Sequence, residues 1–101
     1  MLGITYRLDP AQAEDNAARI AKVVAAVRAS GLDLTYAAAN VDGQGTFVHV
    51  VHGADVAALE SLPEFQAFQA GLRAHLSSPP SFFDFDPIGM SGPLWSEDPR
   101  T

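Results

Sequence analysis

A short glycine-containing segment joins two strand-like stretches near the middle of the chain. Residues 32–41 read LDLTYAAANV and residues 46–52 read TFVHVVH, and both are rich in residue types that strands favour. Between them lies Asp42-Gly43-Gln44-Gly45, whose glycines can adopt the positive φ angles of a tight connection. The sequence therefore predicts a β-hairpin, which gives the fold one antiparallel pair of strands.

The residues before this hairpin predict one strand and one helix. Leu2, Ile4, Tyr6 and Leu8 alternate with other residues, which is the period of a strand with one apolar face, and Asp9-Pro10 ends it. Apolar residues then recur at helical spacing from about Ala13 to Ser30, at Ala17, Ile20, Val23, Val24 and Val27. Gly31 follows as a natural residue for the end of a helix.

The residues after the hairpin predict a second helix and a last strand. A short helical turn around residues 54–62 leads to Pro63, and an amphipathic helix follows that ends at Ser78-Pro79-Pro80. Phe82 to Ile88 is expected to form the fourth strand, with Phe83 and Phe85 on one face. The element order is thus β-α-β-β-α-β. This order predicts an α+β, ferredoxin-like fold, in which two helices cover one face of a four-stranded antiparallel sheet.

The predicted sheet is apolar on both faces. Strand 46–52 offers Phe47 and Val51 to one face and Val48 and Val50 to the other. Two helices can cover only one face, and an exposed apolar sheet face would be prone to association. We therefore expect a homodimer that buries the open sheet face.

The alternative cover for that face is the C-terminal tail. We assign residues 1–88 to a single domain and 89–101 to an irregular tail, in which Leu94 and Trp95 are apolar. Folded back, this tail would shield the sheet of its own subunit. A short segment rich in proline and glycine is a poor lid for a whole sheet, so the homodimer is the favoured interpretation.

Composition excludes several classes of function. The 101 residues contain no cysteine, which rules out disulfides, thiolate metal sites and a cysteine nucleophile. A net charge of −6 disfavours binding to nucleic acid or to anionic membranes. Without a leader-like start or an apolar run long enough to cross a bilayer, the chain is expected to be cytoplasmic.

The order of elements, the hairpin and the segment LPEFQAFQAGLRAHL at residues 62–76 resemble the dimeric α/β-barrel superfamily. The resemblance covers roughly residues 2–88 and is to its antibiotic-biosynthesis-monooxygenase-like branch. It implies two sheets packed as a dimeric α/β barrel, with a ligand cleft between the helices and the sheet of each subunit. Members include cofactor-independent monooxygenases of quinol or polyketide aromatics, haem-degrading enzymes and isomerases.

The haem-degrading members are a poor match. The resemblance implies an Asn on the first strand and a Trp and a haem-ligating His around the second helix. Here Tyr6 takes the strand position, Gln69 falls where the His is expected, and the helix has no Trp. We expect no cofactor.

Three residues are candidates for catalysis: His49, Tyr6 and Asn40. His49 lies on an apolar strand face, where an imidazole can act as a general base, although a buried structural histidine is the alternative. Tyr6 or Asn40 would orient a substrate. His52, three residues after His49, falls on the opposite face of the strand, so the two histidines do not predict a metal site.

A ligand pocket is predicted beside the second helix. Its candidate residues are Phe65, Phe68, Leu72, Tyr36 and His75. Aromatic residues at helical spacing also fit an ordinary core, and His75 fits an exposed helix end, where a cation interacts well with the helix dipole.

The sequence is compatible with two functions from different classes. The first is cofactor-independent oxygenation of a small electron-rich aromatic or quinol, in which the protein orients the substrate and takes its proton. The second is a non-catalytic module that binds a small apolar or aromatic ligand or serves in assembly. A cavity with at least two converging polar groups behind the second helix favours the first.

Overall fold

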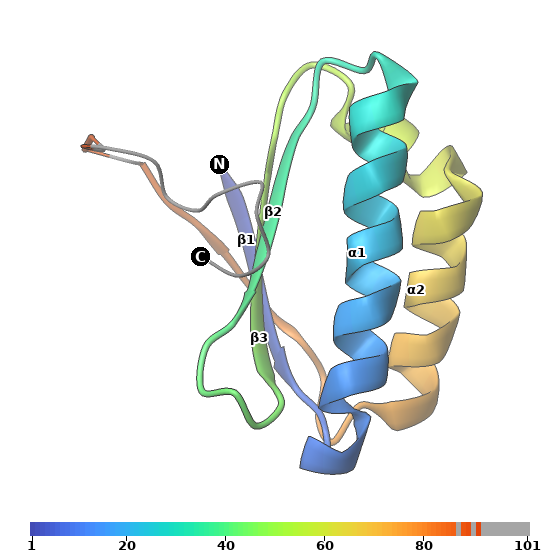
Figure 1. Ribbon diagram of the computed structural model, residues 1–101. Helices are drawn as coiled ribbons and strands as arrows, with labels where there is room; N and C mark the ends of the chain where they lie inside the picture. The colour runs from blue at the N-terminus through green and yellow to red at the C-terminus, as the bar shows by residue number, and fades with distance from the viewer. Residues whose placement is uncertain (87, 90, 92–101) are drawn as a thin grey trace.

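The computed structural model describes residues 1–86, 88, 89 and 91. The described chain has two layers, a four-stranded sheet and two α-helices that both cover the same sheet face (Figure 1). In chain order the elements are β1 (Leu2–Arg7), the 3-10 helix η1 (Pro10–Gln12), α1 (Ala13–Ser30), β2 (Thr35–Asn40), β3 (Thr46–His52), the 3-10 helix η2 (Val56–Ser61), α2 (Pro63–His75) and β4 (Ser81–Asp84). The predicted β-α-β-β-α-β order is confirmed.

The strands lie in the order β2-β3-β1-β4, and each neighbouring pair is antiparallel. Ile4 of β1 pairs with His49 of β3 on one side and with Phe82 of β4 on the other. Each helix therefore connects two strands that have a third strand between them, which is the split β-α-β arrangement of ferredoxin-like folds. This places β3 and β1 at the centre of the sheet.

The ends of α1 follow local sequence signals. The Asp9 carboxylate accepts a 2.9 Å hydrogen bond from the backbone N–H of Ala11, so η1 is capped before α1 begins. Gly31 ends α1 in the left-handed conformation, with φ of 72°. The buried stripe of the helix consists of Ala13, Asn16, Ile20, Val23 and Val27.

The hairpin between β2 and β3 is held by one carboxylate. Asp42 accepts hydrogen bonds from the backbone N–H groups of Gln44 at 2.8 Å and Thr46 at 3.1 Å, and from the Thr46 hydroxyl at 2.8 Å. These bonds stabilise the ionised form and lower the pKa of Asp42 to about 2. The Asx-type turn thus fixes where β3 starts, and with it the register of β3.

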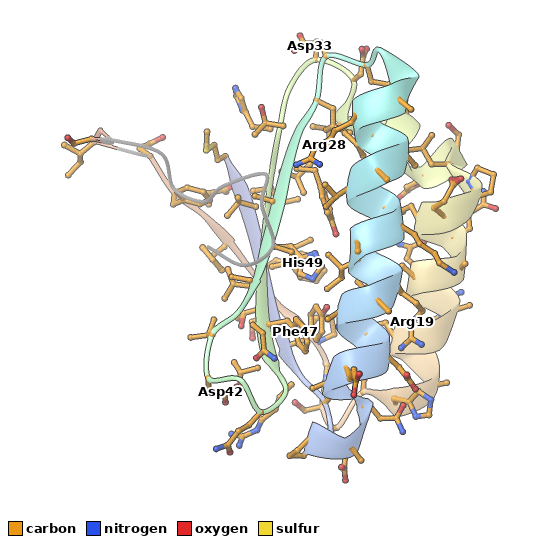
Figure 2. The ribbon with its side chains drawn as sticks, in the orientation of Figure 1. Arg19, Arg28, Asp33, Asp42, Phe47 and His49 are labelled. Carbon is orange, nitrogen blue, oxygen red and sulfur yellow. The ribbon has the colours of Figure 1, made fainter. Side chains whose placement is uncertain are left out.

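The two faces of the sheet differ as the alternation predicts. Phe47, His49 and Val51 of β3 are buried and face the helices, whereas the intervening Val48 and Val50 are half-buried on the open face. Figure 2 shows Phe47 and His49 pointing from the sheet toward the helical layer. Besides these valines, the open face carries a pair of aromatic rings, Phe83 on β4 and Phe85 just after it.

Several predicted boundaries require correction. The second strand begins at Thr35, not at residue 32, and the fourth ends at Asp84, not at Ile88. Leu8 lies beyond β1 and makes an isolated bridge to Leu76, directly after α2. Leu94 and Trp95 of the predicted tail lie outside the described residues. In the described part of the chain, no helix has the length and apolar character needed to cross a membrane.

Candidate active site

A cavity of about 450 Å³ lies between the sheet and α2. Its lining is mainly apolar and comes from all four strands or their flanks, from η2 and from α2. The lining residues are Leu2, Ile4, Tyr6, Tyr36, His49, Val51, Val56, Leu59, Glu60, Phe65, Phe68, Gln69, Leu72, Arg73, Leu76, Pro80 and Phe82. A volume in this range fits a small organic ligand.

The sheet register brings three polar side chains together at the wall of this cavity. His49 comes from β3, and its neighbouring strands contribute Tyr6 and Tyr36. Tyr6 pairs with Phe47 and Tyr36 pairs with Val51, so the two tyrosines flank His49 diagonally from opposite sides. All three point toward the helices because they share the parity of the buried face.

Both ring nitrogens of His49 are hydrogen-bonded to tyrosine. Nε2 lies 2.7 Å from the Tyr6 hydroxyl oxygen, and Nδ1 lies 2.6 Å from the Tyr36 hydroxyl oxygen. Only 3% of His49 is exposed, and the Phe68 ring of α2 packs against the imidazole with a centroid distance of 5.3 Å. His49 is thus both a satisfied buried histidine and part of the cavity wall.

Burial keeps this cluster uncharged at neutral pH. Desolvation lowers the pKa of His49 from 6.5 to about 4. Desolvation also raises the pKa of Tyr6 to about 12, against the lowering effects of a hydrogen bond from Asn16 and the charge of Arg19. The pKa of Tyr36 is raised further, by burial first and then by Tyr6. The cavity therefore presents neutral hydrogen-bonding groups.

A fourth polar residue, Asn16, supports the cluster from α1. Its Nδ2 donates a 2.9 Å hydrogen bond to the Tyr6 hydroxyl oxygen, and the residue is fully buried. Sequence reasoning missed Asn16 because it followed only apolar positions. The signal was present, since Asn16 precedes Ile20, Val23 and Val27 by four, seven and eleven residues on the buried stripe.

Arg19 lies next to Asn16 on α1 and faces α2 (Figure 2). Its Nε and Nη2 and the Oδ1 of Asn16 are buried and have no hydrogen-bond partner in the described chain. The guanidinium packs where α2 has Gly71, and an added Cβ at Gly71 would lie 2.5 Å from Nε. A glycine at that position thus leaves room for Arg19 between the helices.

The far wall and the rim of the cavity come from α2 and its approaches. Phe65 and Phe68 pack with ring centroids 5.8 Å apart, and Leu72 continues this apolar wall one turn later. Charged groups at the cavity are Glu60 and Arg73. A flat apolar ligand with one polar end fits this division between an aromatic wall and a polar cluster.

The predicted site residues are only partly brought together. His49, Tyr6 and Tyr36 meet at the cavity, and Phe65, Phe68 and Leu72 line it. Asn40 is exposed at the end of β2, and His75 is exposed at the end of α2, so neither is among the lining residues. His52 is exposed on the open sheet face. Among residues 1–86, 88, 89 and 91, no three His, Asp or Glu side chains are grouped as metal ligands would be.

No protein-family model matches this sequence, and no curated protein matches it. Solved structures do share its architecture. One, named an antibiotic biosynthesis monooxygenase, superimposes with a TM-score of 0.68 over 88% of this chain and 100% of its own, at 19% identity.

Two further similar structures are of bacterial proteins that are described as candidate antibiotic biosynthesis monooxygenases. The one from Bacteroides thetaiotaomicron has a TM-score of 0.71 and 15% identity, and the match covers 92% of this chain and 95% of that chain. The one from Caulobacter crescentus has a TM-score of 0.69 and 16% identity, with 87% and 88% covered. Identities this low carry no activity across, but the shared architecture shows that this chain has the ferredoxin-like α+β fold of the antibiotic-biosynthesis-monooxygenase-like proteins.

Proposed function

We propose that this protein is a cytoplasmic, homodimeric, cofactor-independent monooxygenase acting on a small electron-rich aromatic, such as a quinol. The observation that carries the proposal is His49, which is hydrogen-bonded through both nitrogens to tyrosines at the wall of an apolar cavity. The similar fold of proteins named as monooxygenases supports it at the level of architecture.

The proposed chemistry needs no electron donor beyond the substrate. Loss of a proton from an activated C–H or O–H gives an electron-rich anion, which reacts with O₂ to form a carbon–oxygen bond and a peroxide. Protonation and loss of water then leave a carbonyl, so that CH₂ and O₂ become C=O and H₂O. The protein has to bind the aromatic, exclude water and accept the proton.

His49 is the proposed proton acceptor, and Tyr6, which is hydrogen-bonded to its Nε2, is the proposed group that orients the imidazole. A pKa near 4 makes an isolated imidazolium unfavourable in this cavity. Transfer of a proton from a bound substrate, however, creates the anion and the cation together, so the net charge of the cavity does not change. Coulomb attraction within the cavity, where the effective dielectric constant is low, would offset the cost of charging each partner.

The homodimer is proposed on the open sheet face. Val48 and Val50 are half-buried there, and the Phe83 ring, which is 40% exposed, lies over Gly3. The Phe83 and Phe85 rings are 5.9 Å apart. A second sheet packed on this surface would bury these side chains, at a gain of about 25 cal/mol for each Å² of apolar area.

Oxygen consumption tests the enzymatic proposal. Purified protein treated with a chelator would be mixed with a panel of quinols and anthrones in an oxygen electrode. We expect uptake above the uncatalysed rate with at least one compound, and a fall of about tenfold or more in His49→Gln. The matched control is His75→Gln, which changes an exposed histidine at the end of α2 that does not line the cavity. Tight binding of these aromatics without oxygen uptake would instead support the non-catalytic ligand-binding module.

A further inference from the structure

His49 has no hydrogen-bonding position left for a ligand. An imidazole has two ring nitrogens, and both are within 2.7 Å of a tyrosine oxygen. Its ring is also surrounded by aromatic neighbours, with the centroid of Tyr6 at 5.2 Å, that of Phe68 at 5.3 Å and that of Tyr36 at 5.6 Å. A ligand oxygen in the cavity therefore has to contact a neighbour of His49.

The two tyrosine hydroxyl groups differ in how many of their hydrogen-bonding positions are unused. Within the described chain, the Tyr6 oxygen has two partners, His49 and Asn16, whereas the Tyr36 oxygen has only His49. A phenolic hydroxyl can donate one hydrogen bond and also accept. Both tyrosines line the cavity, so Tyr36, which has fewer partners, has the position that a ligand can use.

The tautomer of His49 decides whether that position donates or accepts. With the ring proton on Nδ1, His49 donates to the Tyr36 oxygen, and the Tyr36 hydrogen is free to bond a ligand carbonyl or oxyanion. With the proton on Nε2, Tyr36 donates to Nδ1, and its oxygen is free to accept from a ligand hydroxyl. A neutral imidazole can adopt either tautomer.

We propose that Tyr36 is the residue that bonds the ligand's oxygen, that His49 acts through it, and that the cleft selects aromatic ligands bearing a hydroxyl or carbonyl group. The proposal rests on the proposed function for its substrate class and extends it by naming the group that touches the substrate. A hydroxyl group of the aromatic substrate and a carbonyl group of its oxygenated product are, respectively, a donor and an acceptor, and the Tyr36–His49 pair matches both.

The proton step is then a double transfer. The ligand hydroxyl gives its proton to the Tyr36 oxygen while the Tyr36 hydroxyl proton moves to Nδ1 of His49. The ligand O–H bond and the original Tyr36 O–H bond break, and a new Tyr36 O–H bond and an N–H bond form. The products are a ligand oxyanion hydrogen-bonded to a neutral Tyr36 and an imidazolium whose Nε2–H donates to Tyr6. No electrons are exchanged in this step.

Binding of two probes tests the contact independently of turnover. β-Naphthol and β-methylnaphthalene have similar shapes, but only the first has a hydroxyl group. Their dissociation constants would be measured by naphthyl fluorescence with the wild type and with Tyr36→Phe, Tyr6→Phe and His49→Gln. The hydrocarbon reports whether the cleft is intact, because it uses the apolar wall and no hydrogen bond.

We expect Tyr36→Phe to shift the ratio of the two dissociation constants against naphthol by about fivefold to tenfold, the effect of one neutral hydrogen bond. Binding of β-methylnaphthalene should be retained. The proposal would be overturned if Tyr6→Phe or His49→Gln shifted this ratio by that amount and Tyr36→Phe did not. It would also be overturned if none of the three variants changed the ratio.

Oxygen uptake by the same variants separates the two proposals. If Tyr36→Phe changes the ratio of the two dissociation constants but the wild type consumes no oxygen, the oxygenase proposal is wrong and the proposed ligand contact stands. Full uptake by Tyr36→Phe would remove the contact and keep the oxygenase.

Discussion

The side-chain amide of Asn16 donates a 2.9 Å hydrogen bond to the hydroxyl of Tyr6. This bond connects the buried stripe of α1 to β1, and through Tyr6 to His49 of β3. The helical layer thus holds a side chain of the candidate site in place, so that folding and function depend on some of the same buried polar contacts.

Removing this bond should destabilise the fold. Asn16→Ala leaves the Tyr6 hydroxyl with one partner fewer and a small void in a fully buried place, at an expected cost of about 1–3 kcal/mol. Urea denaturation would measure the free energy of unfolding. Lys22→Ala changes an exposed residue of the same helix and should stay within about 0.5 kcal/mol of the wild type. Equal effects of the two substitutions would contradict the buried role of Asn16.

Stability should depend on pH through His49. The pKa of His49 is about 4 in the folded protein, against 6.5 for an unperturbed histidine. Between these values the unfolded chain binds a proton that the folded protein does not, so the free energy of unfolding falls as the pH is lowered from 6.5 to 4. The loss is roughly 3 kcal/mol when the window has been crossed.

His49→Gln should flatten the stability curve in that window. Asp42, whose pKa is lowered to about 2, contributes in the same sense but at lower pH, since its stabilisation is lost as the pH falls below its usual 3.8. Denaturation series at closely spaced pH values would separate the two windows. A wild-type curve that stays level between pH 6.5 and 4 would show that His49 is not a buried neutral group.

The hairpin offers a matched pair of glycines. Gly45 has φ of 128° and would place an added Cβ 2.5 Å from the carbonyl oxygen of Leu8, whereas Gly43 has φ of 70° and open space around it. We expect Gly45→Ala to cost about 2–4 kcal/mol and Gly43→Ala about 1 kcal/mol. Thermal unfolding of both variants checks the order. A larger loss in Gly43→Ala would contradict this turn geometry.

The proposed dimer can be tested by placing a charge on the open face. Val50→Asp should break the association, because an unpaired carboxylate would be buried between two sheets. Light scattering on a sizing column should show the mass fall from twice 10.7 kDa to 10.7 kDa. Ala25→Asp, on the exposed side of α1, is the control and should remain a dimer. A wild type that is monomeric at micromolar concentration would remove the dimer proposal.

Local patterns predicted much of the fold. The period-2 pattern of residues 46–52 gave both the bounds of β3 and the buried face of His49, and helical spacing with Gly31 gave the bounds of α1. Boundaries failed where tertiary pairing decides them. β4 ends at Asp84, which pairs with Leu2 at the start of β1, although Phe85 and Met1 still exchange backbone hydrogen bonds beyond it. The prediction to Ile88 followed the alternation of Phe83 and Phe85 with acidic residues, which continues past Asp84.

The candidate site was less predictable because its contacts depend on register. Alternation placed Tyr6, Tyr36 and His49 each on an apolar face, but nothing local shows that the two tyrosines flank one histidine. Asn40 shares the parity of Tyr36, yet it lies four residues along β2 and beyond the cavity. Asn16 was missed because a polar residue in an apolar stripe becomes informative only when its partner is known.

The central claim is that the cavity catalyses insertion of one oxygen atom from O₂ into an aromatic substrate. Isotopically labelled oxygen gas tests it most directly. The wild-type protein, treated with a chelator, would be incubated under this gas with a quinol or anthrone that supports oxygen uptake. The product would be analysed by mass spectrometry. We predict one labelled oxygen atom in each product molecule, formed faster than without protein and much more slowly with His49→Gln. A product that carries oxygen from water, or that forms at the same rate with His49→Gln, would contradict the account.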